Sequence, residues 1–208
     1  MTLGDHLQLS ETQEYRLVRA LQVALAVILG YGLVTLQFEL AVNAGLPLAV
    51  TFLPALLRRE YSYTMDAGLV LLITVAVFLH AFGSLGFYVW FSWYDEITHT
   101  VSAFLVAGIG YAVLTALEKH SSEIELTSNL RGVFILVFVL AFSVIWEVFE
   151  FGAVWVSQVL GTTSPVQVFG IDDIVTDMVF NVIGGVLVAV WGTGYFEDFV
   201  PFIRRRLR

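Results

Sequence analysis

The stretch WYDEITHTVSAFLVAGIGYAVLTAL, residues 93 to 117, opens with aromatic and charged side chains and then becomes an uninterrupted apolar run. The apolar part, residues 97–117, has the roughly 20 residues that a helix needs to cross a bilayer core about 30 Å thick. Because apolar and polar residues do not alternate, the pattern disfavours the strand of a membrane barrel. The stretch therefore predicts a membrane-spanning helix with polar residues at its N-terminal end.

The composition of the whole chain agrees with a place in a membrane. Of its 208 residues, 58% are hydrophobic and 13% charged, and the mean hydropathy is +0.84. A soluble domain carries about one-quarter charged residues. We therefore expect an all-α polytopic membrane protein whose partner is the lipid bilayer and not a nucleic acid. The absence of Cys excludes disulfides, thiolate catalysis and thiolate metal sites.

Six apolar runs of spanning length predict a bundle of six transmembrane helices, and we treat residues 1–208 as a single membrane-embedded domain. The expected spans are 17–37, 40–57, 67–88, 97–117, 133–155 and 174–195. The second contains Pro47 and Pro54, which membrane helices tolerate where neighbouring groups satisfy the freed carbonyls.

The basic residues all fall on one side of this arrangement, the side that holds both termini and the loops after the second and fourth spans. They are Arg16, Arg19, Arg58, Arg59, Lys119, Arg131, Arg204, Arg205, Arg206 and Arg208. Because positively charged loops stay in the cytoplasm, we predict cytoplasmic termini and the inner (cytoplasmic) cell membrane. Ten of the eighteen acids share that side, so the other eight carry the whole net charge of −8.

Polar side chains recur at helical spacing in four of the spans. They are His80 in the third span, Asp95 and His99 in the fourth, Glu147 and Glu150 in the fifth, and Asp173, Asp177 and Asn181 in the sixth. Within a span they lie three or four residues apart and share one helix face. At a rise of about 1.5 Å per residue, all four sets lie at similar depth in the outer half of the membrane. We therefore expect one polar site between four helices, with Gly184 and Gly185 allowing a neighbouring helix to approach closely.

This predicted site contains many acids and no basic partner. A charged side chain at mid-membrane costs about 2.5–3.5 kcal/mol, and converging carboxylates also repel one another. Because the outer side has no Lys or Arg, three remedies remain open. The carboxyls share protons, His80 or His99 is an imidazolium, or a cation is bound.

Some of these features have ordinary explanations. Asp172 and Glu96 are assigned to helix N-termini, and Asp173 fits a cap and the polar site equally well. His80 alone can pack helices, and Asn181 can join them by a hydrogen bond. Capping does not explain the two glutamates inside the fifth span. The loop GTTSPVQVFGIDD, residues 161–173, is a plain turn or a flap over the site.

Two segments are assigned to the membrane surfaces. The aromatic run FYVWFSWY, residues 87–94, is typical of an interfacial belt. The terminal RRRLR, residues 204–208, is typical of an anchor to anionic lipid heads.

The motifs FLHAFGSLGFY, YDEITHTVSAF, WEVFEF and GIDDIVTDMVFNVIGG together resemble the YjdF-like inner-membrane family. The resemblance implies that the matching motif positions are His80, Asp95, His99, Glu147, Glu150, Asp173 and Asp177. A looser resemblance links the second half to the VanZ-like family, associated with glycopeptide resistance. The chain lacks the Arg that is usual there. These resemblances imply an envelope role and supply no reaction.

The first functional hypothesis is a metal-dependent hydrolase or transferase acting on a lipid or lipid-linked envelope substrate. The expected ligands of a divalent cation, Zn²⁺, Mg²⁺ or Mn²⁺, are Asp95, His99, Asp173 and Asp177. Glu147 or Glu150 is the expected general base, supported by His80 and Asn181. A phosphatase that grips phosphate with Arg or Lys is disfavoured, since that side has neither.

Two other functions stay open at this stage. Acid and His side chains in spans also mark pathways for protons or metal cations. Against transport, the inner halves of the spans show no matching polar series, with Gln22 the one deep candidate. The third possibility is a non-catalytic protein in which a cation braces the helices.

Overall fold

The computed structural model describes residues 9–121, 123–166 and 170–207, and their regular structure is helical with no strand. In this described part, six helical segments are long and apolar enough to cross a membrane. They are Glu11–Val34, Phe38–Tyr61, Ala67–Trp90, Trp93–His120, Ser128–Leu160 and Ile171–Arg206. The predicted all-α class and the number of spans are confirmed, and the helices imply a lipid environment.

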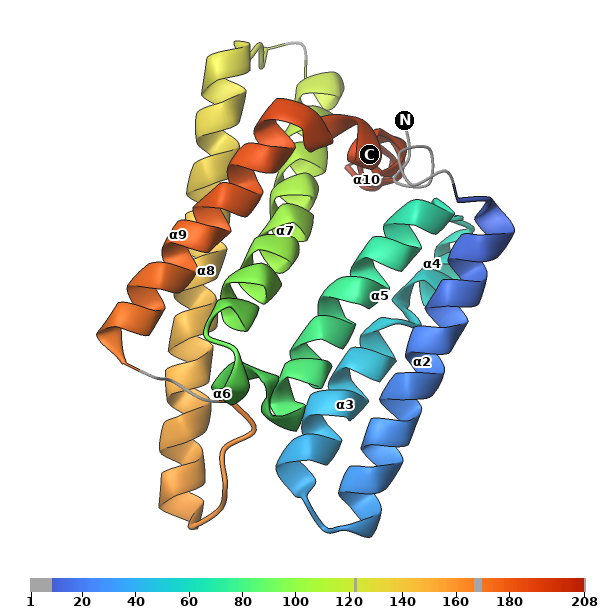
Figure 1. Ribbon diagram of the computed structural model, residues 1–208. Helices are drawn as coiled ribbons and strands as arrows, with labels where there is room; N and C mark the ends of the chain where they lie inside the picture. The colour runs from blue at the N-terminus through green and yellow to red at the C-terminus, as the bar shows by residue number, and fades with distance from the viewer. Residues whose placement is uncertain (1–8, 122, 167–169, 208) are drawn as a thin grey trace.

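The helices that build these spans are named as in Figure 1. In chain order they are α2 (Glu11–Val34), α3 (Phe38–Val50), α4 (Leu53–Tyr61), α5 (Ala67–Phe82), α6 (Tyr88–Trp90), α7 (Trp93–His120), α8 (Ser128–Leu160), α9 (Ile171–Leu187) and α10 (Val200–Arg206). A π-helical turn, Gly83–Phe87, joins α5 to α6. Another, Val188–Gly192, and a 3₁₀ segment, Thr193–Phe199, join α9 to α10.

Three spans are therefore not the single helices that the sequence predicts. The second breaks between α3 and α4, with Pro47 inside α3 and Pro54 in the first turn of α4. The third changes pitch near its C-terminal end, where Gly86 takes a φ of 115° that other residues rarely adopt. The sixth widens into a π-helical turn after Leu187, tightens into the 3₁₀ segment, and continues in helical form to Arg206, well past the expected end.

The helices pack in two groups, which Figure 1 shows side by side. α2, α3 and α5 contact one another, and α7, α8 and α9 contact one another. The groups meet where α5 and α10 pack against α7. A Cβ added at Gly184 would lie 2.5 Å from the Thr100 carbonyl oxygen on α7, and one at Gly185 would lie 3.2 Å from Leu136 on α8. These glycines thus bring α9 close to both neighbours, as their spacing predicts.

The connectivity gathers the basic side chains at one end of the bundle. There α2, α5 and α8 begin, and α4, α7 and α10 end (Figure 1). This basic end holds Arg16, Arg19, Arg58, Arg59, Lys119, Arg131, Arg204, Arg205 and Arg206. Arg208 lies outside the described residues. Which side of the membrane the basic end faces stays a prediction.

Candidate functional site

The first turns of α7 start the site at the end of the bundle opposite the basic end. Asp95, Thr98, His99 and Ser102 share one face, because they stand at positions i, i+3, i+4 and i+7 of the helix. The N-cap position of α7 is Ser92, so Asp95 is not a cap. Instead the Thr98 hydroxyl donates to Asp95 Oδ1 at 3.2 Å. The carboxylate is thereby held toward the interior of the bundle.

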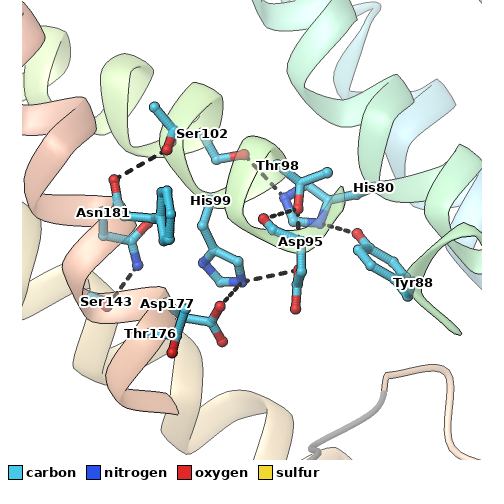
Figure 2. A network of polar contacts seen from close by, with 12 residues as sticks. His80, Tyr88, Asp95, Thr98, His99, Ser102, Ser143, Thr176, Asp177 and Asn181 are labelled. Atoms are coloured by element: carbon cyan, nitrogen blue, oxygen red, sulfur yellow. Dashed lines mark hydrogen bonds and ion pairs between the residues drawn. The ribbon is translucent and has the colours of Figure 1, made fainter. Parts of the chain in front are cut away.

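Asp177 on α9 meets this face of α7. The Nε2 atom of His99 lies 3.5 Å from Asp95 Oδ1 and 3.5 Å from Asp177 Oδ1 (Figure 2). His99 is 5% exposed and Asp177 is 3% exposed. One donor atom from each of the three residues lies within 4.8 Å of the others, so the group can hold a metal ion. A buried carboxylate needs such compensation, since an unpaired charge is costly away from water.

Both distances from His99 Nε2 to the carboxylate oxygens exceed the length of a direct charge-assisted hydrogen bond. A charge-assisted N–H···O bond is about 2.7–2.9 Å long, and one Nε2–H cannot serve two carboxylates fully. Both 3.5 Å separations exceed that length. They leave room for an ion between His99 Nε2 and the two carboxylate oxygens.

Three further acids surround the group without joining it. The carboxyl of Asp177 interacts electrostatically with Asp173, Glu147 and Glu150 as well as with Asp95. Glu147 is 8% exposed, and its Oε1 has no hydrogen-bond partner among the described residues. Asp173, expected to be a ligand, lies one turn before Asp177 in the half-buried first turn of α9. The structure thus brings five acids together and places two of them beside His99 Nε2.

His80 on α5 forms the wall opposite Asp177. Its Nε2 lies 3.0 Å from Ser102 Oγ, and its Nδ1 lies 3.0 Å from the Tyr88 hydroxyl (Figure 2). Its ring meets that of His99 nearly edge-on, with centroids 6.2 Å apart. A Cβ at Gly83 would lie 2.4 Å from the Tyr88 ring, so this glycine lets Tyr88 fold back onto His80. His80 is therefore fixed through both ring nitrogens.

Asn181 supports the site from the deeper turn of α9. Its Nδ2 donates to Ser143 Oγ on α8 at 2.7 Å. It also lies within hydrogen-bonding reach of the His99 side chain. A partner of this kind orients a histidine ring that binds a metal. The predicted role of Asn181 in joining helices and its supporting role in the site are compatible.

A cleft of about 440 Å³ opens onto these groups between α3, α5, α7 and α8. Its polar lining includes His80, Tyr88, Asp95, His99 and Glu150, and most of its other walls are apolar. Clefts of about 300–1,000 Å³ with apolar walls and a few convergent polar groups are typical of small-molecule sites. Two of the five acids, Asp95 and Glu150, therefore lie at the wall of a space that a ligand can enter.

The loop between α8 and α9 borders this cleft. Ser164, Pro165 and Val166 are among the lining residues. The Asn43 side chain of α3 donates to the carbonyl of Pro165, and Thr163 donates to Glu39 Oε2 at 3.0 Å. This loop thus connects the two helix groups across the cleft and is not a plain turn. Residues 167–169 of the predicted loop lie outside the described residues.

With this geometry in place, residues 16–198 match a family described as "Predicted membrane protein (DUF2238)". The chain belongs to this family. DUF2238 is the YjdF-like family that the motifs resemble, whereas the VanZ-like resemblance is not supported. No curated protein and no solved structure matches the chain. Membership in DUF2238 therefore supports a membrane protein and indicates no function.

Several residues of the site in this DUF2238 member are not foreseen from its sequence. Tyr88 belongs to the aromatic run assigned to the membrane surface, and Asn43 lies in the proline-containing second span. Ser102 and Ser143 carry a usable signal, since each shares a helix face with a predicted site residue. Asp172 and Glu96 lie in the first turns of α9 and α7, as predicted, although Gly170 and Ser92 hold the N-cap positions.

Proposed function

We propose that this protein is a metal-dependent hydrolase or transferase that acts, within the membrane, on a lipid or lipid-linked substrate of the cell envelope. The observation that carries the proposal is a donor group of Asp95, His99 and Asp177, of which Asp95 and His99 line a largely apolar cleft. A catalytic zinc site typically has three protein ligands and keeps its fourth position open. A bilayer-embedded cleft is reached most directly by a substrate already dissolved in the bilayer.

The spacing of the donors favours zinc among the candidate cations. Two ligands about 2.1 Å from a tetrahedral ion lie about 3.4 Å apart, whereas adjacent ligands of an octahedral ion lie about 3.0 Å apart. His99 Nε2 lies 3.5 Å from each of the two carboxylate oxygens. A ligand set with imidazole and few carboxylates also suits Zn²⁺ better than Mg²⁺.

The residues around this group supply the remaining chemical roles. A bound Zn²⁺ would lower the pKa of a coordinated water and polarise the bond to be cleaved. Glu147 is the proposed general base, because its buried Oε1 has no partner and its carboxyl interacts electrostatically with Asp177. It takes the proton from the attacking water and returns it to the leaving group as the bond breaks. Glu150, which lines the cleft, is the proposed second proton carrier.

The lining of the cleft also limits the classes of substrate that it can bind. None of the described lining residues is Lys or Arg, and Asp95, Glu39 and Glu150 are acids. A phosphate group would have the metal as its sole positive partner, whereas an acyl ester or amide needs no counter-charge. We therefore place an acyl lipid, or a lipid-linked amide, ahead of a phosphoester.

The proposal is tested by the metal content of the purified full-length protein, prepared in detergent without chelator. We expect a near-stoichiometric divalent metal in the wild type and at least about a tenfold loss of bound metal in Asp177→Asn. Glu147→Gln should keep the metal, because Glu147 is not among the three donors. Once a substrate is found, Glu147→Gln should slow turnover by about 10²–10⁴-fold.

Size-exclusion profiles and melting curves of both variants separate this proposal from a structural brace. A brace predicts that Asp177→Asn aggregates or melts far earlier, while an enzyme predicts a folded, metal-free variant. Absence of metal from the wild type after metal-replete growth would overturn the proposal. Proton-coupled transport would then be the function to test.

A further inference from the structure

A second cavity, of about 230 Å³, lies at the basic end and is separate from the site described above. It is bounded by α2, by the break between α3 and α4, and by the segment that leads into α5. Its lining residues are Tyr15, Val18, Arg19, Gln22, Thr51, Phe52, Pro54, Ala55, Arg58, Thr64, Met65 and Val70.

The proline-induced break in the second span gives this cavity a fixed polar floor. Thr51 lies in the break, is 4% exposed, and donates from its hydroxyl to the Leu48 carbonyl at 2.6 Å. Gln22 of α2 donates from Nε2 to the same hydroxyl at 3.1 Å. Gln22 therefore braces α2 against the break in the second span.

Two arginines at the rim have no acidic partner. Arg19 and Arg58 line the cavity, and neither makes an ion pair within the described residues. Neighbouring cations are engaged elsewhere: Arg59 pairs with Glu60 at 3.1 Å, and Arg206 lies over the Tyr61 ring at 4.2 Å. The cavity therefore has two guanidinium groups available for an anion.

The acids near the cavity do not line it beside the two arginines. Glu11, Glu14 and Asp66 act electrostatically on Tyr15, as Arg58 does, but none of the three lines the cavity. Asp66 caps α5, accepting from the Leu69 N–H at 3.2 Å. The hydroxyls of Tyr15 and Thr64 add neutral donors to the rim.

We propose that this cavity binds the phosphate of an anionic group, with Arg19 and Arg58 as its ligands. Arg is the side chain best suited to grip phosphate, because its fork donates two parallel hydrogen bonds. The volume of about 230 Å³ is below the range of about 300–1,000 Å³ for drug-sized ligands. It therefore suits a headgroup and not a whole lipid. The phosphate belongs to a phospholipid headgroup or to a soluble phosphate, and both share this chemistry.

The test uses the full-length protein in detergent and follows its melting temperature as ligand is titrated. The probes are phosphatidylglycerol, phosphatidylcholine and inorganic phosphate. The cavity variant is Arg19→Gln with Arg58→Gln. The matched control is Arg16→Gln with Arg59→Gln, which removes the same charge from the same two helices at positions that do not line the cavity.

We expect phosphatidylglycerol to stabilise the wild type more than phosphatidylcholine. Its apparent affinity should fall by at least about tenfold in the cavity variant and change little in the control, because only the cavity variant removes the guanidinium groups that would hydrogen-bond the phosphate. Stabilisation by inorganic phosphate with the same variant pattern would support the phosphate site and assign it to a soluble ligand. Equal losses in both variants would reduce the effect to surface charge and overturn the proposal.

No stabilisation by any of the anionic probes would overturn it as well. If the double Gln variant does not fold, Arg19→Lys with Arg58→Lys replaces it. That variant keeps both charges but loses the two-pronged geometry of the guanidinium groups. A specific phosphate site therefore predicts weaker binding of the anionic probe than in the wild type, whereas a diffuse charge effect predicts unchanged binding. The site described earlier lies at the other end of the bundle, so neither variant tests the proposed enzymatic function.

Discussion

Glu147 Oε1 and the Tyr63 hydroxyl are both buried without a hydrogen-bond partner among the described residues, and their surroundings give them different roles. Glu147 interacts electrostatically with Asp177 of the site, and Glu150, one turn further along α8, lines the cleft. Tyr63 lies among aromatic rings at the basic end, with centroids 5.7 Å from Phe199 and 4.5 Å from Phe202. Burial raises the pKa of Tyr63 to about 12, so its hydroxyl is neutral and acts only as a packing group.

Tyr63→Phe is therefore expected to stabilise the protein. Burying a hydroxyl without a partner costs about 1–3 kcal/mol, and Phe keeps the ring contacts. For a chain of this size, each kcal/mol corresponds to about 2–4 °C in melting temperature. Tyr63→Ala is the control and should lower the melting temperature, because it removes the ring. A lower melting temperature for Tyr63→Phe would show that the hydroxyl has a partner, such as an ordered water.

At the scale of elements, the contact of α9 with α7 decides whether the site exists. Asp177 reaches His99 because Gly184, two turns further along α9, lets the two backbones approach. A Cβ at Gly184 would lie 2.5 Å from a backbone oxygen, which cannot move aside as a side chain does. The helices would have to separate.

Gly184→Ala is accordingly expected to destabilise the protein by about 1–3 kcal/mol. It should also weaken metal binding, because α9 carries Asp177. Gly152→Ala is the matched control on α8: nothing lies within 4 Å of its Cβ, and replacing a helical Gly by Ala gains about 0.5–1 kcal/mol. Melting curves and metal content of both variants provide the measurement. Similar behaviour of the two would mean that α7 and α9 do not depend on close approach.

At the scale of elements, hydropathy and spacing predict the spans of this chain but not how the helices bend and align. Hydropathy gives the spans because a bilayer imposes their length, yet it does not register a backbone change such as the turn at Gly86. That turn changes the rotation of the chain and brings Tyr88 from the expected membrane surface to His80. Helical spacing pairs Asp95 with His99. It cannot choose between Asp173 and Asp177, which share one face, because the axial offset of α9 against α7 makes that choice.

At the scale of the molecule, the acids of the site and the basic residues lie at opposite ends. Among the buried ionisable groups described, His99, Glu147 and Asp177 belong to the site, and Glu14 lies near the basic end. The hydrogen bond between Gln22 and Thr51 joins α2 to the end of α3, and neither residue belongs to the site. A cleft at one end, with no polar series leading from it, suits a reaction on a bilayer substrate better than passage of an ion across the membrane.

Orientation of the bundle is predicted by the placement of every described Lys and Arg at one end. Because the chain has no Cys, single cysteines can be introduced and labelled in intact cells with a membrane-impermeant maleimide. Ser92→Cys, exposed beside the site, should react from outside, whereas Ser121→Cys at the basic end should react only after permeabilisation. Labelling of both from outside would contradict the number of crossings between them. The reverse pattern would mean that the acidic cleft faces the cytoplasm, and it would exclude substrates of the outer leaflet. It would also mean that the phosphate cavity does not lie in the leaflet where anionic lipids concentrate.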